Sequence, residues 1–259
     1  MLLELGYFDY TQNVQRQASI AGYAVNGLLV FVSREDIEPD THLTVRSPSA
    51  THVERIDLDK LHQISDWWGG AGDDDTANLP GFIYVDLGLI ALADGEELTI
   101  TLDCLGTPGA ATKIGVAAVV DDLPQHDELQ YAYAMHSDGS FNVEAATSLF
   151  VFGTSLSTSG ELINVKLGDD TRSTTLRATN WYANLLGKIE LDNTTMGVAF
   201  DYSYGQPMTV NHSTAALVSV VRRVVQMSPE RAKAATARLA KLAARKIDKV
   251  DASTIRATT

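Results

Sequence analysis

The residue types that usually do chemistry are present in this sequence, but their spacing matches no catalytic or ligand-binding motif. None of the six histidines stands in an HExxH pattern. His42, His52 and His62 recur every ten residues, which fits neither one strand face nor a helix-borne ligand pair, so we expect surface side chains. Ser155 lacks the glycine two residues later that a nucleophile elbow needs, and no P-loop or GxGxxG motif occurs. The sequence therefore predicts no catalytic residue, no cofactor and no enzyme activity.

One acidic cluster and one cysteine are the remaining reactive features. Asp73, Asp74 and Asp75 follow Gly72, and clustered carboxylates suit the hard cation Ca²⁺. Their spacing is not that of an EF-hand, and aspartates beside glycine usually form a solvated loop, so we expect no metal site and keep calcium as the alternative. Cys104 is the only cysteine, which excludes an internal disulfide, and its place at the end of an alternating run predicts a small core residue.

Two aromatic pairs, Trp67-Trp68 and Trp181-Tyr182, offer platforms on which sugars could stack. Each pair stands in or beside a short segment with helical spacing of apolar residues. We therefore favour a packing role between a helix and a sheet for both pairs.

Composition and charge indicate a globular chain with a distinct tail. Of 259 residues, 45% are hydrophobic and 20% charged, and the longest nearly apolar run, residues 20–32, is too short to span a membrane. Residues 1–6 lack the basic region and apolar core of a secretory signal. Residues 226–259 carry a net charge of +5, which leaves −18 for residues 1–225 out of a total of −13. A body of that charge repels nucleic acid, so only the tail suits phosphates.

The body is predicted to consist of short strands, and the tail to be a helix. Runs rich in β-branched, aromatic and leucine residues, separated by turn signals, predict strands over 28–32, 43–46, 53–58, 82–87 and 98–103. Helical spacing predicts short helices over 58–68 and 176–186. Ser228-Pro229-Glu230 is a helix start signal, and the alanine-rich basic run that follows predicts a helix to Val250.

The strands also indicate an internal duplication, which should be sought before a fold is assigned. Five blocks recur in the same order: 24–33 with 145–154, 43–46 with 163–166, 67–68 with 181–182, 98–103 with 196–201, and 117–122 with 218–223. On this alignment the segment 69–83 belongs to the first copy alone. We therefore predict an all-β chain of two tandem jelly-roll sandwiches, residues 1–125 and 126–225, joined near 123–138 and followed by a basic helix and tail over 226–259.

Two similar sandwiches in tandem, each with a short helix between strands, resemble the double jelly-roll major capsid proteins of tailless, membrane-containing icosahedral viruses and phages. The blocks 24–33 with 145–154, 67–68 with 181–182, and 98–122 with 196–223 carry this resemblance. It implies a homotrimer whose six sandwiches form a pseudo-hexameric capsomer of a virion shell, assembled in the host cytoplasm.

The resemblance also implies a terminal helix near an internal viral membrane or other virion proteins. The basic residues of the predicted helix would take that role: Arg231, Lys233, Arg238, Lys241, Arg245, Lys246 and Lys249. Packing of this helix against the acidic body is an equal alternative, and genome packing is a weaker one; we expect no sequence-specific nucleic-acid binding.

Two other classes of protein stay open at this point. One is a two-domain carbohydrate-binding or adhesin-like module, or a hydrolase built on tandem jelly rolls. The other is a different phage virion component, such as a spike, tail or cement protein.

Overall fold

The computed structural model describes most of the body and single positions of the tail. The described residues are 1–32, 41–67, 71–72, 81–92, 94–107, 113–121, 127–136, 139–144, 147–153, 162–175, 178, 181, 185, 197–202, 207–212, 217–225, 229, 232–233, 235–237, 240 and 244.

The first half of the chain forms nine strands and one helix among its described residues. They are β1 (Leu2–Asp9), β2 (Val14–Ala21), β3 (Ala24–Val32), β4 (Thr41–Ser47), β5 (Ala50–Asp57), α1 (Leu58–Trp67), β6 (Ala71–Gly72), β7 (Gly81–Ala91), β8 (Glu97–Cys104) and β9 (Lys113–Val120). A sheet of order β1-β9-β3-β7-β6 faces the strands β2-β8-β4-β5, and pairing within each layer is antiparallel. The core between the layers contains Leu28, Val30, Leu43 and Val45, all fully buried.

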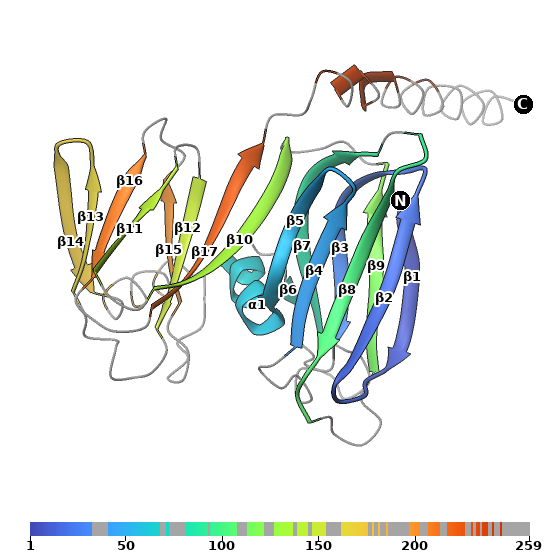
Figure 1. Cartoon of the computed structure of the whole chain (residues 1–259), viewed down its shortest axis with the longest axis horizontal. Helices are drawn as coiled ribbons and strands as arrows, with labels where there is room; N and C mark the ends of the chain where they lie inside the picture. Colours follow the sequence, from blue (N-terminus) through green and yellow to red (C-terminus); the bar gives the residue numbers. More distant parts are fainter. Residues whose placement is uncertain are drawn as a thin grey trace, which may run out of the picture.

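The second half repeats this arrangement, with eight strands in the part that the structure describes. They are β10 (Glu128–His136), β11 (Gly139–Val143), β12 (Thr147–Gly153), β13 (Leu162–Leu167), β14 (Asp170–Thr175), β15 (Gly197–Tyr202), β16 (Met208–His212) and β17 (Leu217–Val225). The strands β10-β17-β12-β15 face a sheet of order β11-β16-β13-β14, around a core that includes Leu149 and Val165. Apart from the two-residue strand β6, each layer matches its counterpart strand by strand in chain order, so both halves have the jelly-roll arrangement of two facing four-stranded layers. The predicted all-β tandem fold is confirmed (Figure 1).

The burial of each strand explains its sequence pattern. In β8, apolar and polar residues alternate because one face points into the core and the other towards solvent. In β12 the run from Leu149 to Phe152 is apolar throughout, and all four residues are buried. Leu149 and Val151 lie in the core of the second sandwich, whereas Phe150 and Phe152 lie in the cluster of the first. A strand covered on both faces loses its alternation.

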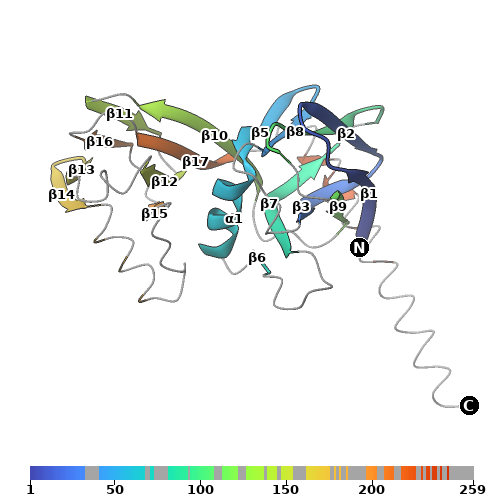
Figure 2. The same cartoon turned by 90° about the horizontal axis from the view of Figure 1, so that it is seen from below.

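Helix α1 lies between the two sandwiches (Figures 1 and 2). It begins after Asp57, whose Oδ1 accepts a hydrogen bond from the backbone N–H of Asp59 at 2.9 Å, as an N-cap residue does. Leu58, Leu61 and Ile64 are buried in the main apolar cluster. The predicted helix over 58–68 is therefore confirmed almost to its last residue.

The sheet order corrects the predicted duplication in three places. Strand β15 lies beside β12 as β7 lies beside β3, so residues 196–201 correspond to β7, and the counterpart of 98–103 is β16. The connections 58–80 and 176–196 are then nearly equal in length, so the first copy has no extra segment at 69–83. The predicted joining segment 123–138 contains strand β10. The strand pairs β3 with β12 and β4 with β13 were aligned correctly, and β9 was matched to the right strand, β17, but two residues out of register.

The tail is helical at every described position, namely 229, 232–233, 235–237, 240 and 244. Ala235 is buried in a small cluster with Ala24, Leu89 and Ala91, so the start of this helix packs on the first sandwich. Among the described residues, no helix is both long and apolar enough to cross a membrane.

Candidate functional site

The two sandwiches are joined by one continuous sheet, and the residues at this junction form the candidate functional site. Strand β10 of the second sandwich adds to the edge of β5 in the first, with Tyr131 opposite Val53 in parallel pairing. The result is an eight-stranded sheet of order β15-β12-β17-β10-β5-β4-β8-β2. All other strand pairs described are antiparallel, so this parallel pair marks the place where two separate units meet.

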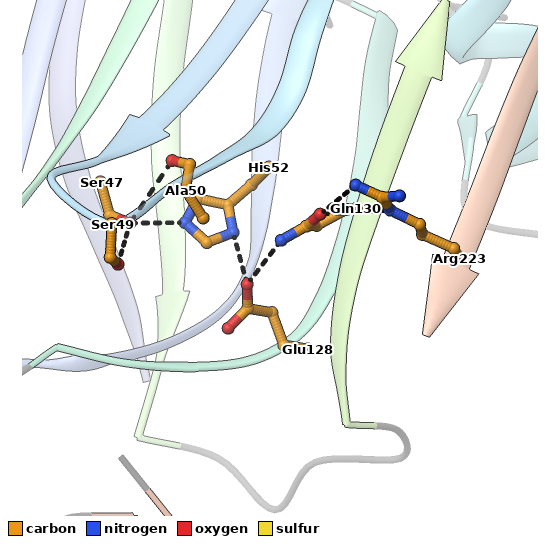
Figure 3. A network of polar contacts seen from close by, with 7 residues as sticks. All are labelled: Ser47, Ser49, Ala50, His52, Glu128, Gln130 and Arg223. Carbon is orange, nitrogen blue, oxygen red and sulfur yellow. Dashed lines mark hydrogen bonds and ion pairs between the residues drawn. The ribbon is translucent and has the colours of Figure 1, made fainter. Parts of the chain in front are cut away.

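A buried polar network lies at the junction (Figure 3). The Nδ1 atom of His52, on β5, lies 3.2 Å from Oε1 of Glu128 on β10, and the two side chains are 0% and 4% exposed. On its other side, His52 Nε2 forms a 3.0 Å hydrogen bond with the Ser47 hydroxyl at the β4–β5 turn. A buried polar contact of this kind fixes the relative position of two strands, because separating it leaves polar groups without water.

The network continues into the second sandwich. Gln130 Nε2 donates to the same Glu128 oxygen at 3.0 Å, and Arg223 on β17 donates to Gln130 Oε1 at 3.0 and 3.3 Å. Arg223 also lies 3.6 Å from Glu144, in an exposed ion pair. The polar contacts thus run from a turn of one sandwich across three strands into the next.

Tyr131 anchors β10 to the other layer of the first sandwich. Its hydroxyl donates a 2.8 Å hydrogen bond to the backbone carbonyl of Asp86 on β7. Burial raises the pKa of the Tyr131 phenol far above its ordinary value, so the group remains a hydrogen-bond donor. Strand β10 therefore contacts both layers at one end of the first sandwich.

Apolar contacts complete the junction. Phe150, Phe152, Val218 and Val220 point away from the core of their own sandwich and belong to one cluster with the buried residues of α1. All four are at most 4% exposed. The junction is a continuous core with a polar network at its edge, which favours a fixed arrangement of the two sandwiches.

The structure also contradicts the predicted surface position of one histidine at the junction. His52 is fully buried, so the prediction of a surface side chain is wrong for it, while His42 and His62 are half-buried. Nothing in the sequence near His52 signals a partner, because Glu128 lies 76 residues further along the chain.

A pair of histidines, His136 and His212, lies close together in the second sandwich. The His136 ring stacks on Phe141 with centroids 3.7 Å apart, and its Nε2 forms a 2.7 Å hydrogen bond with the Ser219 hydroxyl. His212 approaches at a centroid distance of 6.4 Å. Burial, followed by the charge of His212, lowers the pKa of His136 below its ordinary value.

This lowered pKa predicts acid sensitivity. Because folded His136 binds a proton less readily than the unfolded chain does, stability falls as the pH drops below about 6.5 towards the lowered pKa. We expect His136→Gln to lose less stability than the wild type between pH 7.5 and pH 5.5, measured by urea unfolding at both values. An equal loss in the two proteins would show that His136 does not titrate in this way.

The remaining predicted features are placed as follows. Cys104 is fully buried, as predicted, and burial raises its pKa. The packing role predicted for the aromatic pairs is wrong for Trp181, which is 58% exposed, while the side chains of Trp67, Trp68 and Tyr182 lie outside the description. Asp73–Asp75 also lie outside it, and the described residues contain no cluster of three or more metal-binding side chains.

Of the basic tail residues proposed to face a partner, the structure describes Lys233, which is helical and exposed. The other six lie outside the described residues: Arg231, Arg238, Lys241, Arg245, Lys246 and Lys249.

No protein-family model matches this sequence, and no curated protein matches it. The fold, however, is that of the double jelly-roll viral capsid proteins. It is similar to the major capsid protein P2 of bacteriophage PM2, with 11% identity, 88% of this chain and 98% of that chain covered, and a TM-score of 0.56.

A chain of the Sulfolobus turreted icosahedral virus is similar at 6% identity, with coverages of 93% and 97% and a TM-score of 0.59. A chain of the PBCV-1 virus capsid is similar at 10% identity, with coverages of 86% and 92% and a TM-score of 0.51. At identities this low, the structural similarity establishes a shared fold.

Proposed function

We propose that this chain is a structural virion protein, the major capsid protein of an icosahedral shell. Three copies form a pseudo-hexameric capsomer in which residues 1–125 and 126–225 each supply one jelly roll. The chain acts by assembly and not as an enzyme.

The observation that carries this proposal is the edge-to-edge junction of two equivalent sandwiches, which stand side by side (Figure 1). One end of the first sandwich, formed by β5 and β7, receives β10 at the start of the second. The corresponding outer strands, β1 of the first sandwich and β14 of the second, lie at opposite ends of the molecule (Figure 1). A unit with two different edges associates head to tail, and such contacts close into a ring when the rotation repeated at each junction adds up to a full turn. The fold shared with viral capsid proteins supports the same conclusion.

The proposed partners are other copies of the chain and, through the basic tail, an internal viral membrane or another virion protein. Several lysines and arginines near an anionic bilayer contribute about 1 kcal/mol each. The packing of Ala235 on the first sandwich is compatible with this role, because exposed Lys233 remains accessible on the same helix. Assembly in the host cytoplasm completes the proposal.

Electron microscopy of the purified chain at high concentration tests this function. We expect particles with six lobes in projection, and sheets or shells of them as the concentration rises. Particles with only two lobes at every concentration would contradict the proposal.

A further inference from the structure

An aromatic row crosses the outer face of the first sandwich. Tyr7 on β1 stands opposite Gly115 on β9, Gly115 opposite Phe31 on β3, and Phe31 opposite Phe82 on β7. Residues opposite one another in a ladder share a face of the sheet, so Tyr7, Phe31 and Phe82 form one row. A Cβ placed on Gly115 would lie 2.8 Å from the Tyr7 ring and 3.4 Å from the Phe31 ring, so the rings lie close to this glycine.

This aromatic row is open to solvent in the isolated chain. Tyr7 is 59% exposed and Phe82 38% exposed, and Phe31 is half-buried. The alternate residues Ile114 and Val116 on β9 fill the core, which places the row on the outer side. Exposed aromatic side chains in one row are typical of a surface that another element covers.

The same place on the second sandwich is covered within the chain. Phe152, on β12, is the counterpart of Phe31 on β3 and stands opposite Val218 as Phe31 stands opposite Gly115. Phe152 and Val218 are 2% and 4% exposed and lie in the cluster that contains α1 of the first sandwich. Met135, which stands opposite Val218 as Tyr7 stands opposite Gly115, is 67% exposed. The middle of this face is thus buried within the chain, in one cluster with the helix of the preceding sandwich, while its edge at Met135 stays open.

The second sandwich has its own helical segment at the position of α1. Ala178, Trp181 and Leu185 are the described residues of this segment, and all three are helical. Their spacing of three and four places them on one helix face. Trp181 is 58% exposed and Leu185 80% exposed, in contrast to the buried Leu61 and Ile64 of α1.

The strand edges beside these surfaces show the same contrast. Strand β5, which pairs with β10, contains the buried residues His52 and Val53, whereas its counterpart β14 is exposed over its first four residues. When β3 and β12 are aligned at Leu28 and Leu149, the ladders place Leu2 of β1 where Tyr131 stands in β10. Leu2 is 56% exposed and Tyr131 is 3% exposed. Open strand edges of this kind are templates for pairing with another chain.

We propose that copies of this chain join head to tail, with the helix face of Trp181 and Leu185 in one copy covering Phe31 and Phe82 of the aromatic row of the next, and with β14 adding in parallel to β1. The contact between copies then repeats the junction between β5 and β10 within the chain. Each copy presents one surface of each kind, so the interface is heterologous and closes into a ring. This inference rests on the proposed capsomer and names the surfaces that hold it together.

The charges at the paired edges agree with this arrangement. Aligning β4 with β13 at Leu43 and Ile163 places Arg172 of β14 where Val53 stands in β5. The Arg172 side chain is 64% exposed and pairs with Asp170 on its own strand, and the β1 strand that it would approach carries exposed Glu4 as well as Asp9, which pairs with Lys113. Opposite charges across an interface favour one partner and one register.

Two charge-introducing variants of the full chain test the proposal. Trp181→Glu and Phe31→Glu each place a carboxylate in one of the two surfaces, and we expect each to weaken association about thirtyfold or more, because Phe152, the counterpart of Phe31 in the junction within the chain, is 2% exposed. Met135→Glu is the matched control, because Met135 is a 67% exposed apolar residue on β10 outside both surfaces. Masses come from light scattering, and circular dichroism checks that the three variants melt like the wild type.

Mixing the two variants gives the sharpest result. Each variant keeps one intact surface, so an equimolar mixture should form a pair of chains of about 56 kDa and stop there, whereas each alone stays near 28.0 kDa. If both variants keep the mass of the wild-type assembly, the named surfaces are wrong while the capsomer proposal stands. If the wild type itself is a monomer at every concentration, both proposals are overturned.

Discussion

Replacing Glu128 with alanine is expected to lower the free energy of unfolding by about 3 kcal/mol. The substitution leaves Nδ1 of fully buried His52 without its carboxylate, and it removes the acceptor of the Gln130 amide. Both groups lie where the two sandwiches meet, so the loss should also loosen the parallel pairing of β5 with β10. Urea unfolding at pH 7 measures the first effect, and amide hydrogen exchange at Val53 and Tyr131 measures the second.

Glu144→Ala is the control for this prediction. Glu144 is 80% exposed and lies 3.6 Å from Arg223, so its ion pair is screened by water and should contribute less than about 1 kcal/mol. If Glu128→Ala costs no more than this control, the polar network does not hold the junction.

Truncating Tyr131 to alanine is expected to cost about 4 kcal/mol, the second large effect. The ring is 3% exposed, and its removal leaves a cavity between the two layers of the first sandwich and the first strand of the second. The hydrogen bond to the Asp86 carbonyl is lost as well. Urea unfolding measures the change.

Tyr131→Phe separates the two contributions. It keeps the ring and removes only the hydroxyl, so we expect a cost of about 1 kcal/mol. Equal stability of the alanine and phenylalanine variants would mean that the ring fills no space at the junction.

Much of the fold follows from local patterns of apolar and polar residues in the sequence. The alternation of β8 and the apolar spacing of α1 predicted both elements, because each has one face in the core. The recurrence of the β3 pattern in β12 predicted the duplication, since equivalent strands face equivalent surroundings. Strand β1 was missed, because an edge strand with exposed Leu2 and Tyr7 lacks a clear alternation.

The parts that failed depend on contacts between distant residues. The strand that matches 98–103 was misassigned because strand patterns resemble one another, and only the order within the sheet separates β15 from β16. His52 was predicted at the surface because its partner Glu128 belongs to the other sandwich. For Trp181, packing was expected from its place in a segment with helical spacing, but the side chain is 58% exposed in the single chain. Local sequence patterns therefore predicted the strands and the helix α1. The residues of the candidate site depend on contacts between segments that are distant in the sequence.

The mass of the full-length chain in solution, measured by light scattering, tests the central claim most directly. Association head to tail into a closed ring of six sandwiches predicts about 84 kDa, three times the 28.0 kDa of one chain, with no larger open chains at moderate concentration. A mass that remains at 28.0 kDa as the concentration rises would contradict the account.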